Sequence, residues 1–248
     1  MAGIARSAHR DTGRAPYWAD PGSAAATAFE RLSEATVQDI ARHRSLELSS
    51  DRTKAVYFVL EGWLIISKST EDGQRQIVDF VLPGEVFDPG SALADQSSTD
   101  LSALTRARVS IISQAGWQDL LRDHPELQKR LNRRVAASYS RIAERLLRIG
   151  KGSAEVRIAY AICELCLRST DLGLVDGSKC HLPLTQQVLG DFVGLSSVHV
   201  SRTIRRLRRA EILRTGDHLD IYLDDVDRLA EVAEIDLDDL RAEIIPAA

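Results

Sequence analysis

The sequence has few cysteines, and none of its apolar runs is long. Its 248 residues include three cysteines, which all lie between positions 163 and 180. Three clustered cysteines are too few for the disulfide framework of a small secreted protein. No stretch reaches the roughly 18 consecutive apolar residues of a membrane span, and the first residues lack the pattern of a signal peptide. We therefore expect a soluble, cytoplasmic protein without a membrane contact.

Histidine is absent from Leu46 to Ile112, where the sequence has short β-type runs. The runs are AVYFVLEGWLIISK, RQIVDFVLPG and RARVSIIS, with turn residues between them. Short strands without intervening helices predict a small antiparallel barrel or roll. A cupin-like metal-dependent enzyme is the alternative from another class, but its site would need several inward-facing histidines and carboxylates. We therefore expect no enzyme, and neither a bound metal nor a cofactor.

Positive charge is concentrated in one C-terminal segment, although the formal net charge of the chain is −4. From His181 to Arg214 the sequence has six arginines and two acidic residues, a local charge of 6 − 2 = +4. From Asp217 to Ala248 acidic residues dominate. A basic segment of this kind is typical of nucleic-acid binding, because phosphates respond to the local field. A solvated helix face is the alternative.

A long helix is predicted from Pro125 to Ile149, since proline suits a first helical turn and Gly150-Lys151-Gly152 ends the pattern. Positions spaced alternately by four and three residues form one seam along it, as in a coiled coil. The seam consists of Leu131, Val135, Ser138, Ile142, Arg145 and Ile149. We expect it to join two copies in a homodimer, and the alternative is that it packs on the chain's own roll. A second helix is predicted from Ser153 to Arg168.

The segment from Leu182 to Tyr222 has the pattern of a winged helix-turn-helix. Thr185 is suited to cap a first helix, Gly194 to the turn after it, and Ser196 to cap a second helix. One side of the second helix is expected to face the core with Val200, Thr203, Ile204 and Leu207. Two short strands around Thr215-Gly216-Asp217-His218 then predict a wing. A purely structural helical hairpin is the alternative.

The opposite side of the second helix carries residues suited to DNA. Ser197 and Ser201 can touch base edges or phosphate, and Arg202 can hold guanine O6 and N7 in a bidentate fork. Phosphate contacts are predicted for Thr185, His199, Arg205, Arg206, Arg208 and Arg209.

In LTQQVLGDFVGLSSVHVSRTIRRL and YFVLEGWLIISKSTEDGQRQIVDFVLPGE, the chain resembles the Crp/Fnr family of bacterial transcription regulators. The resemblance covers roughly residues 28–223 and implies an α+β fold with an N-terminal antiparallel β-roll like a cyclic-nucleotide-binding domain, a long dimerisation helix and a C-terminal winged helix-turn-helix. The expected divisions are a flexible arm (1–28), the roll (29–122), the dimerisation helix (123–150), the DNA-binding domain (151–223) and an acidic helical extension (224–248). The implied partners are double-stranded DNA, a second copy and, in an activator, RNA polymerase.

The family's phosphate-contacting threonine falls on Thr185, and its base-reading positions fall on Ser197, Val198, Ser201 and Arg202. Many members have glutamate where this chain has Val198. Valine cannot accept a hydrogen bond from cytosine N4, although it can touch a thymine methyl group. The half-site is therefore expected to differ at that base.

Members that respond to nucleotides resemble one another in a phosphate-binding cassette, which this chain lacks. Asp88-Pro89 stands where they have Gly-Glu, and Leu101-Ser102-Ala103 where they have Arg-Ser-Ala. Without the arginine the charge-assisted fork on the phosphate is lost. We expect no response to cyclic AMP, as in FixK-like members, and the identity of any effector stays open.

The three cysteines allow two interpretations. Cys163 and Cys166 lie one turn apart on the predicted helix, and with Cys180 and His181 they would formally make a Cys3His metal site. The apolar surroundings of the helical pair favour a core position instead. Cys180, in the predicted polar connection, is a possible redox-sensitive thiol.

Overall fold

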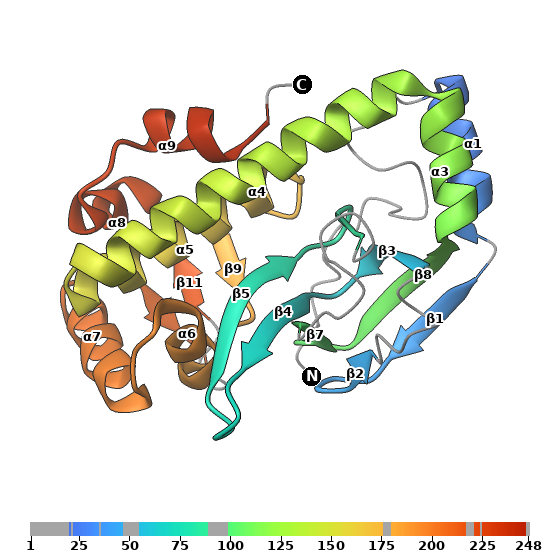
Figure 1. Ribbon diagram of the computed structural model, residues 1–248. Coiled ribbons are helices and arrows are strands. Elements are labelled where there is room, and N and C mark those ends of the chain that lie inside the picture. The colour runs from blue at the N-terminus through green and yellow to red at the C-terminus, as the bar shows by residue number, and fades with distance from the viewer. Residues whose placement is uncertain are drawn as a thin grey trace, which may run out of the picture.

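The computed structural model describes residue 20 and residues 22–34, 36–46, 55–88, 99–175, 180–216, 221–223 and 225–246. It has an antiparallel β-roll, one long helix that crosses the molecule, and a C-terminal domain made mostly of helices (Figure 1). The α+β arrangement predicted from the sequence is confirmed. Within these ranges, no helix is both long and apolar enough to cross a lipid bilayer.

The roll consists of two four-stranded antiparallel sheets. One has the strand order β1-β8-β3-β6 and the other β2-β7-β4-β5. The strands are β1 (Val37–Ile40), β2 (Ser45–Leu46), β3 (Ala55–Glu61), β4 (Leu64–Ser69), β5 (Arg75–Val81), β6 (Val86–Phe87), β7 (Thr99–Ala103) and β8 (Ala107–Ser113). Tyr57, Val59, Leu64, Leu101 and Val109 are among the side chains buried between the sheets. Burial of these apolar side chains is the main stabilising contribution in the roll.

Two helices cover one end of the roll. They are α1 (Ala24–Glu34) and α3 (Gln114–Asp123). The ring of Phe29 lies edge-on to Phe58, with 4.8 Å between centroids, and to Trp117 at 6.2 Å. The predicted flexible arm therefore extends too far, because its last residues belong to α1, where Ala25 and Ala26 are buried. Residues 1–19 and residue 21 of that arm lie outside the described residues.

The long helix α4 (Pro125–Lys151) starts at the predicted proline and ends where Gly152 caps it. It runs over the roll with its N-terminal half and over the C-terminal domain with the other (Figure 1). This position puts α4 in contact with both the roll and the C-terminal domain.

The C-terminal domain is built around α5 (Ala154–Asp171), which is buried from Ile158 to Ser169. The remaining elements are β9 (Cys180–Leu182), α6 (Gln186–Val193), α7 (Ser197–Arg209), β10 (Arg214–Thr215) and β11 (Ile221–Leu223). The three strands form a sheet of order β10-β11-β9. Because other elements cover α5 from several sides, it serves as the core of this domain.

Two further helices complete the chain, α8 (Val226–Ala233) and α9 (Leu237–Ile244). Asp225 and Asp236 cap them by accepting hydrogen bonds from backbone N–H groups of the first turns. Helix α8 packs on α5, and α9 packs on α4. Arg228 of α8 donates hydrogen bonds to the carbonyls of Ala210 and Glu211, directly after α7. The acidic extension is therefore integrated into the fold.

Candidate nucleic-acid interface

Helices α6 and α7 meet at a tight turn that the local sequence fixes. The Thr185 hydroxyl accepts a hydrogen bond from the Val188 N–H at 3.2 Å and so caps α6. Gly194 ends that helix with φ 66° and ψ 42°, a left-handed conformation that glycine adopts without strain. A Cβ atom on Gly190 would lie 2.6 Å from the carbonyl oxygen of Leu195, so a glycine is needed where the chain crosses the helix.

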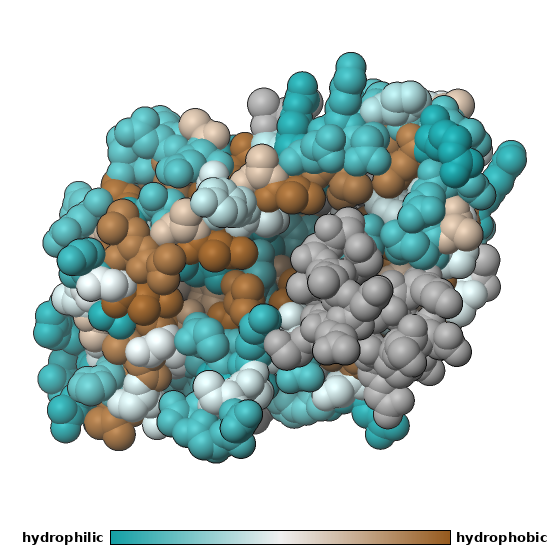
Figure 2. Space-filling view, in the orientation of Figure 1, coloured by the Kyte–Doolittle hydropathy of each residue, from teal (hydrophilic) through white to brown (hydrophobic). Residues whose placement is uncertain are grey.

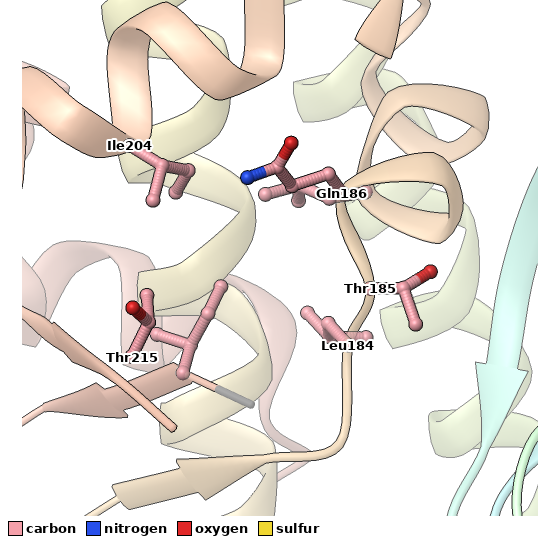
Figure 3. A pocket seen from close by; sticks show the side chains of 7 residues that line it. Leu184, Thr185, Gln186, Ile204 and Thr215 are labelled. Atoms are coloured by element: carbon pink, nitrogen blue, oxygen red, sulfur yellow. The ribbon is translucent and has the colours of Figure 1, made fainter. Parts of the chain in front are cut away.

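The inner side of α7 is buried as predicted. Val200, Ile204 and Leu207 are all at most 3% exposed. Figure 3 shows Ile204 of α7 opposite residues that begin α6 and opposite Thr215 of β10. The cavity between them measures only about 10 Å³, room for one water at most. The two helices and the wing are therefore packed together without space for a ligand.

The outer side of α7 presents its N-terminal end to solvent. Ser197, Val198 and Arg202 are exposed, and Ser201 is half-buried. Val198 is 56% exposed, so its methyl groups can contact an apolar base edge. The structure thus brings the four predicted base-reading residues to one accessible surface.

The predicted phosphate contacts are not equivalent. Arg205, Arg206, Arg208 and Arg209 are all exposed. Arg206 differs from the other three in forming an ion pair with Glu155 at the start of α5, in which its Nε lies 3.1 Å from Oε1. The His199 ring lies 3.1 Å from the Ser196 hydroxyl, at the cap of α7. Thr185, for which a phosphate contact is also predicted, is the residue that caps the N-terminus of α6.

The wing forms as predicted, with a third strand added. Strand β11 pairs with β10 and with β9, and the rings of His181 and Tyr222 stack at 4.7 Å across the latter pair. The predicted wing tip around Asp217 and His218 lies outside the described residues.

A cluster of buried charges, which the sequence did not predict, joins this domain to the rest of the chain. Its members are Asp79, Glu85, Arg141, Arg145, Glu164 and Arg168, all at most 7% exposed. Burial alone would raise the pKa of Asp79, but Arg168, Arg141 and Arg145 outweigh it and hold that pKa well below its usual range. At Glu164 burial dominates and raises the pKa. The negative charge of the cluster is therefore held most firmly on Asp79.

Helix α4 exposes an apolar stripe, although not quite the predicted one. Val135, Tyr139, Ile142 and Leu146 are between 42% and 75% exposed, and Figure 2 shows apolar side chains gathered over this helix.

Two predicted members of the seam face the chain's own fold. Ser138 accepts a hydrogen bond from the buried Arg141 and lines a cavity between α4 and the roll, and Arg145 belongs to the charged cluster. Leu131 and Ile149 lie at the edge of the stripe and are half-buried. Since an α-helix turns by about 100° per residue, the centre of the exposed stripe is rotated about the helix axis by about 50° from the centre of the predicted seam.

Two of the three cysteines are paired in the structure. Cys180 lies in β9, is 5% exposed and forms a disulfide with Cys166, with 5.7 Å between the Cα atoms. Cys163 is a buried free thiol. The helical pair Cys163 and Cys166 is buried, as predicted, whereas Cys180 is a buried, disulfide-bonded residue of β9 and not a free thiol in a polar connection. The pairing also rules out joint ligation of a metal by the three cysteines and His181 in this state.

A cavity of about 380 Å³ lies between the roll and α4. Its walls include Phe87, Asp88, Arg134, Ile142 and the near-C-terminal Pro246. Leu101, at the position of the cassette arginine, is fully buried between the two sheets of the roll. A leucine buried there cannot hold a phosphate.

Two family models match the chain. Residues 41–124 match the cyclic nucleotide-binding domain, and residues 140–232 match the Crp-like helix-turn-helix domain. The chain is 31% identical over 160 residues to the nitrogen fixation regulation protein FixK of Bradyrhizobium diazoefficiens, which is 64% of this chain and 66% of the relative. It is 26% identical over 214 residues to the transcriptional activator protein FnrL of Cereibacter sphaeroides, covering 82% and 85%.

The fold is also similar to solved structures. The structure of FixK2 from Bradyrhizobium japonicum superposes with a TM-score of 0.67 at 23% identity, covering 79% of this chain and 96% of that one. The chain belongs to the Crp/Fnr family of DNA-binding transcription regulators. These regulators are not enzymes, which decides against a cupin-like activity.

Proposed function

We propose that the chain acts in the cytoplasm as a homodimer that places two α7 helices in successive major grooves of a pseudo-palindromic DNA site, roughly 34 Å apart. The observation that carries this proposal is the exposed face of α7, which has five arginines and no acidic residue in its sequence SVHVSRTIRRLRR. The opposite side of α7 is packed into the core through Val200, Ile204 and Leu207, so the exposed arginine face is held in a fixed position.

The residues divide into two roles. Ser197, Val198, Ser201 and Arg202 read bases, while Thr185, His199, Arg205, Arg208 and Arg209 contact phosphates. Arg206 contributes less to phosphate binding, since Glu155 already holds it. Val198 favours a thymine methyl group as its contact.

The test is a binding-site selection in vitro followed by titrations on the enriched sequence. Arg202→Ala should flatten the base preference at one position of each half-site, because its fork is worth about 1 to 3 kcal/mol of discrimination. Arg209→Ala should instead lower the salt dependence of binding and leave the preferred sequence unchanged. Equal selectivity of the wild type and Arg202→Ala would remove Arg202 from the reading role.

Dimerisation is assigned to the exposed stripe of α4, with Val135, Tyr139, Ile142 and Leu146 at its centre. Their spacing of four, three and four residues matches a two-helix seam. Of the predicted interface, Leu131, Val135, Ile142 and Ile149 keep this role, with Leu131 and Ile149 at its edge.

The roll acts without cyclic AMP in this proposal, because the cassette arginine is replaced by the buried Leu101. Cyclic AMP added in calorimetry should give no binding heat and no change in DNA affinity. The dimer would activate by touching RNA polymerase or repress by occluding it, and transcription in vitro from a promoter that carries the selected site separates the two.

A redox response is a second proposal, supported by the disulfide between Cys166 and Cys180. Disulfides of cytosolic proteins are usually transient or redox-sensing. This one ties the wing sheet to α5, so its reduction would loosen the wing. The proposal fails if oxidised protein, reduced protein and Cys180→Ser bind the selected DNA equally well.

A further inference from the structure

One buried side chain of the DNA-binding domain reaches into the roll. Arg168, near the end of α5, is 2% exposed. Its Nη1 donates to Asp79 Oδ1 at 2.8 Å, and its Nη2 donates to the Phe80 carbonyl and to Glu85 Oε2, both at 2.9 Å. A planar guanidinium that makes three directed contacts fixes orientation as well as distance.

The long helix joins the same cluster. Arg141 Nη2 donates to Asp79 Oδ2 at 3.1 Å, and Arg145 Nε lies 3.2 Å from Glu164 Oε2 of α5. The roll, α4 and α5 therefore meet at one point, with three carboxylates against three guanidinium groups. Buried ion pairs of this kind add little stability over well-packed apolar residues. What their directed contacts can provide instead is a defined relative orientation of the elements that they join.

A second contact holds the helix-turn-helix itself. Arg75 of β5 forms an ion pair with Asp191 of α6 at 2.7 Å, and the Gln76 amide donates to the Phe192 carbonyl at 3.1 Å. The C-terminal domain is thus attached to strand β5 at two points: the buried contact of Arg168 with Asp79 and Phe80, and the surface contact of Arg75 with Asp191. Two points of attachment prevent it from pivoting about either one.

In this attached position both functional surfaces remain free. The base-reading end of α7 is exposed, and so is the stripe on α4 that we assign to the dimer. The attached arrangement is therefore compatible with dimerisation and DNA binding at the same time.

We propose that Arg168 is a positioning residue for DNA recognition. By holding the DNA-binding domain at one angle to the roll and α4, it sets the separation of the two α7 helices in the dimer and so selects the spacing of the half-sites. This inference rests on the proposed function, because it requires a dimer that binds two half-sites.

The experiment measures affinity for three DNA duplexes. One carries the sequence selected by the wild type, and the others have one base pair added to or removed from the spacer. One base pair moves a half-site by about 3.4 Å and turns it by about 35°. We expect the wild type to lose at least tenfold in affinity on the altered spacers. Arg168→Met should bind the selected duplex at least tenfold more weakly than the wild type does. Its affinities for the three duplexes should differ from one another by less than threefold.

Arg122→Met is the matched control, since Arg122 pairs with Asp119 within α3 and joins no two domains. It should keep the wild-type spacing penalty. Arg168→Lys should restore part of that penalty, because it returns the charge without the fork. If Arg168→Met does not fold, as judged by circular dichroism, Arg75→Glu replaces it. That exposed substitution repels Asp191 and should reduce the spacing penalty at least threefold.

The outcomes distinguish a failure of the proposed function from a failure of the positioning role of Arg168. A wild type that binds every sequence alike contradicts the proposed function. A wild type with a spacing penalty that Arg168→Met keeps unchanged overturns the positioning role. Where Arg75→Glu stands in for Arg168→Met, an unchanged spacing penalty overturns the proposal that the attachment of the domain to β5 sets the spacing.

Discussion

Replacing Leu146 with alanine tests the position of the dimer stripe, and the size of the effect follows from its exposure. Leu146 is 66% exposed in the single chain. Full burial of a leucine side chain contributes about 1.5 to 3 kcal/mol, so burying two-thirds of it contributes about 1 to 2 kcal/mol. A symmetric dimer buries two copies, which gives about 2 to 4 kcal/mol. Because about 1.4 kcal/mol corresponds to a tenfold change in a dissociation constant, the dissociation constant of the dimer should rise about 30- to 700-fold.

Sedimentation equilibrium over a concentration series measures this constant directly. Leu147→Ala is the matched control, because Leu147 is 52% exposed but lies about 100° further round the helix. We expect Leu147→Ala to dimerise like the wild type. The assignment of this stripe to the dimer is refuted if Leu146→Ala leaves the dissociation constant unchanged, or if both variants weaken the dimer equally. Thermal melts of both variants show whether the fold itself is intact.

Three further predictions concern buried and paired groups. Arg208→Ala should lower the salt dependence of DNA binding more than Arg206→Ala does, because Glu155 already neutralises Arg206; equal slopes in salt titrations would contradict this. Burial raises the pKa of the Cys163 thiol to about 12, so native protein at pH 8 should leave it unmodified by a maleimide, as mass spectrometry can show. Because the pKa of Asp79 is lowered by folding, its charge stabilises the fold above pH of about 4, and that contribution is lost as the pH falls further. Melting temperatures from pH 6 to 3 should therefore fall more steeply in the wild type than in Asp79→Asn.

Local signals in the sequence were sufficient for the roll, the long helix and the helix-turn-helix. Caps such as Thr185 and the left-handed Gly194 act within a few residues, so they can be recognised without the fold. The register of the α4 stripe was harder, because polar Ser138 and Arg145 also fit the alternating spacing. The partners of Arg145 come from the roll and from α5, which the sequence of α4 alone does not show, whereas Ser138 forms its hydrogen bonds within α4.

The charged cluster and the disulfide could not be predicted in this way. Asp79 and Arg168 are far apart in sequence, and each taken alone has the character of a surface residue. The pairing of Cys166 with Cys180 depends on the distance between their Cα atoms, which only the folded chain defines. Both features result from the packing of α5 against its neighbours.

The last residues of the chain have a practical consequence for handling the protein. Ile244 is fully buried, and Pro246 lines the cavity between the roll and α4. A purification tag fused after residue 248 would be separated from Pro246 by two residues and so be tethered close to that cavity. Effector response and DNA affinity are therefore best measured on protein from which any C-terminal tag has been removed.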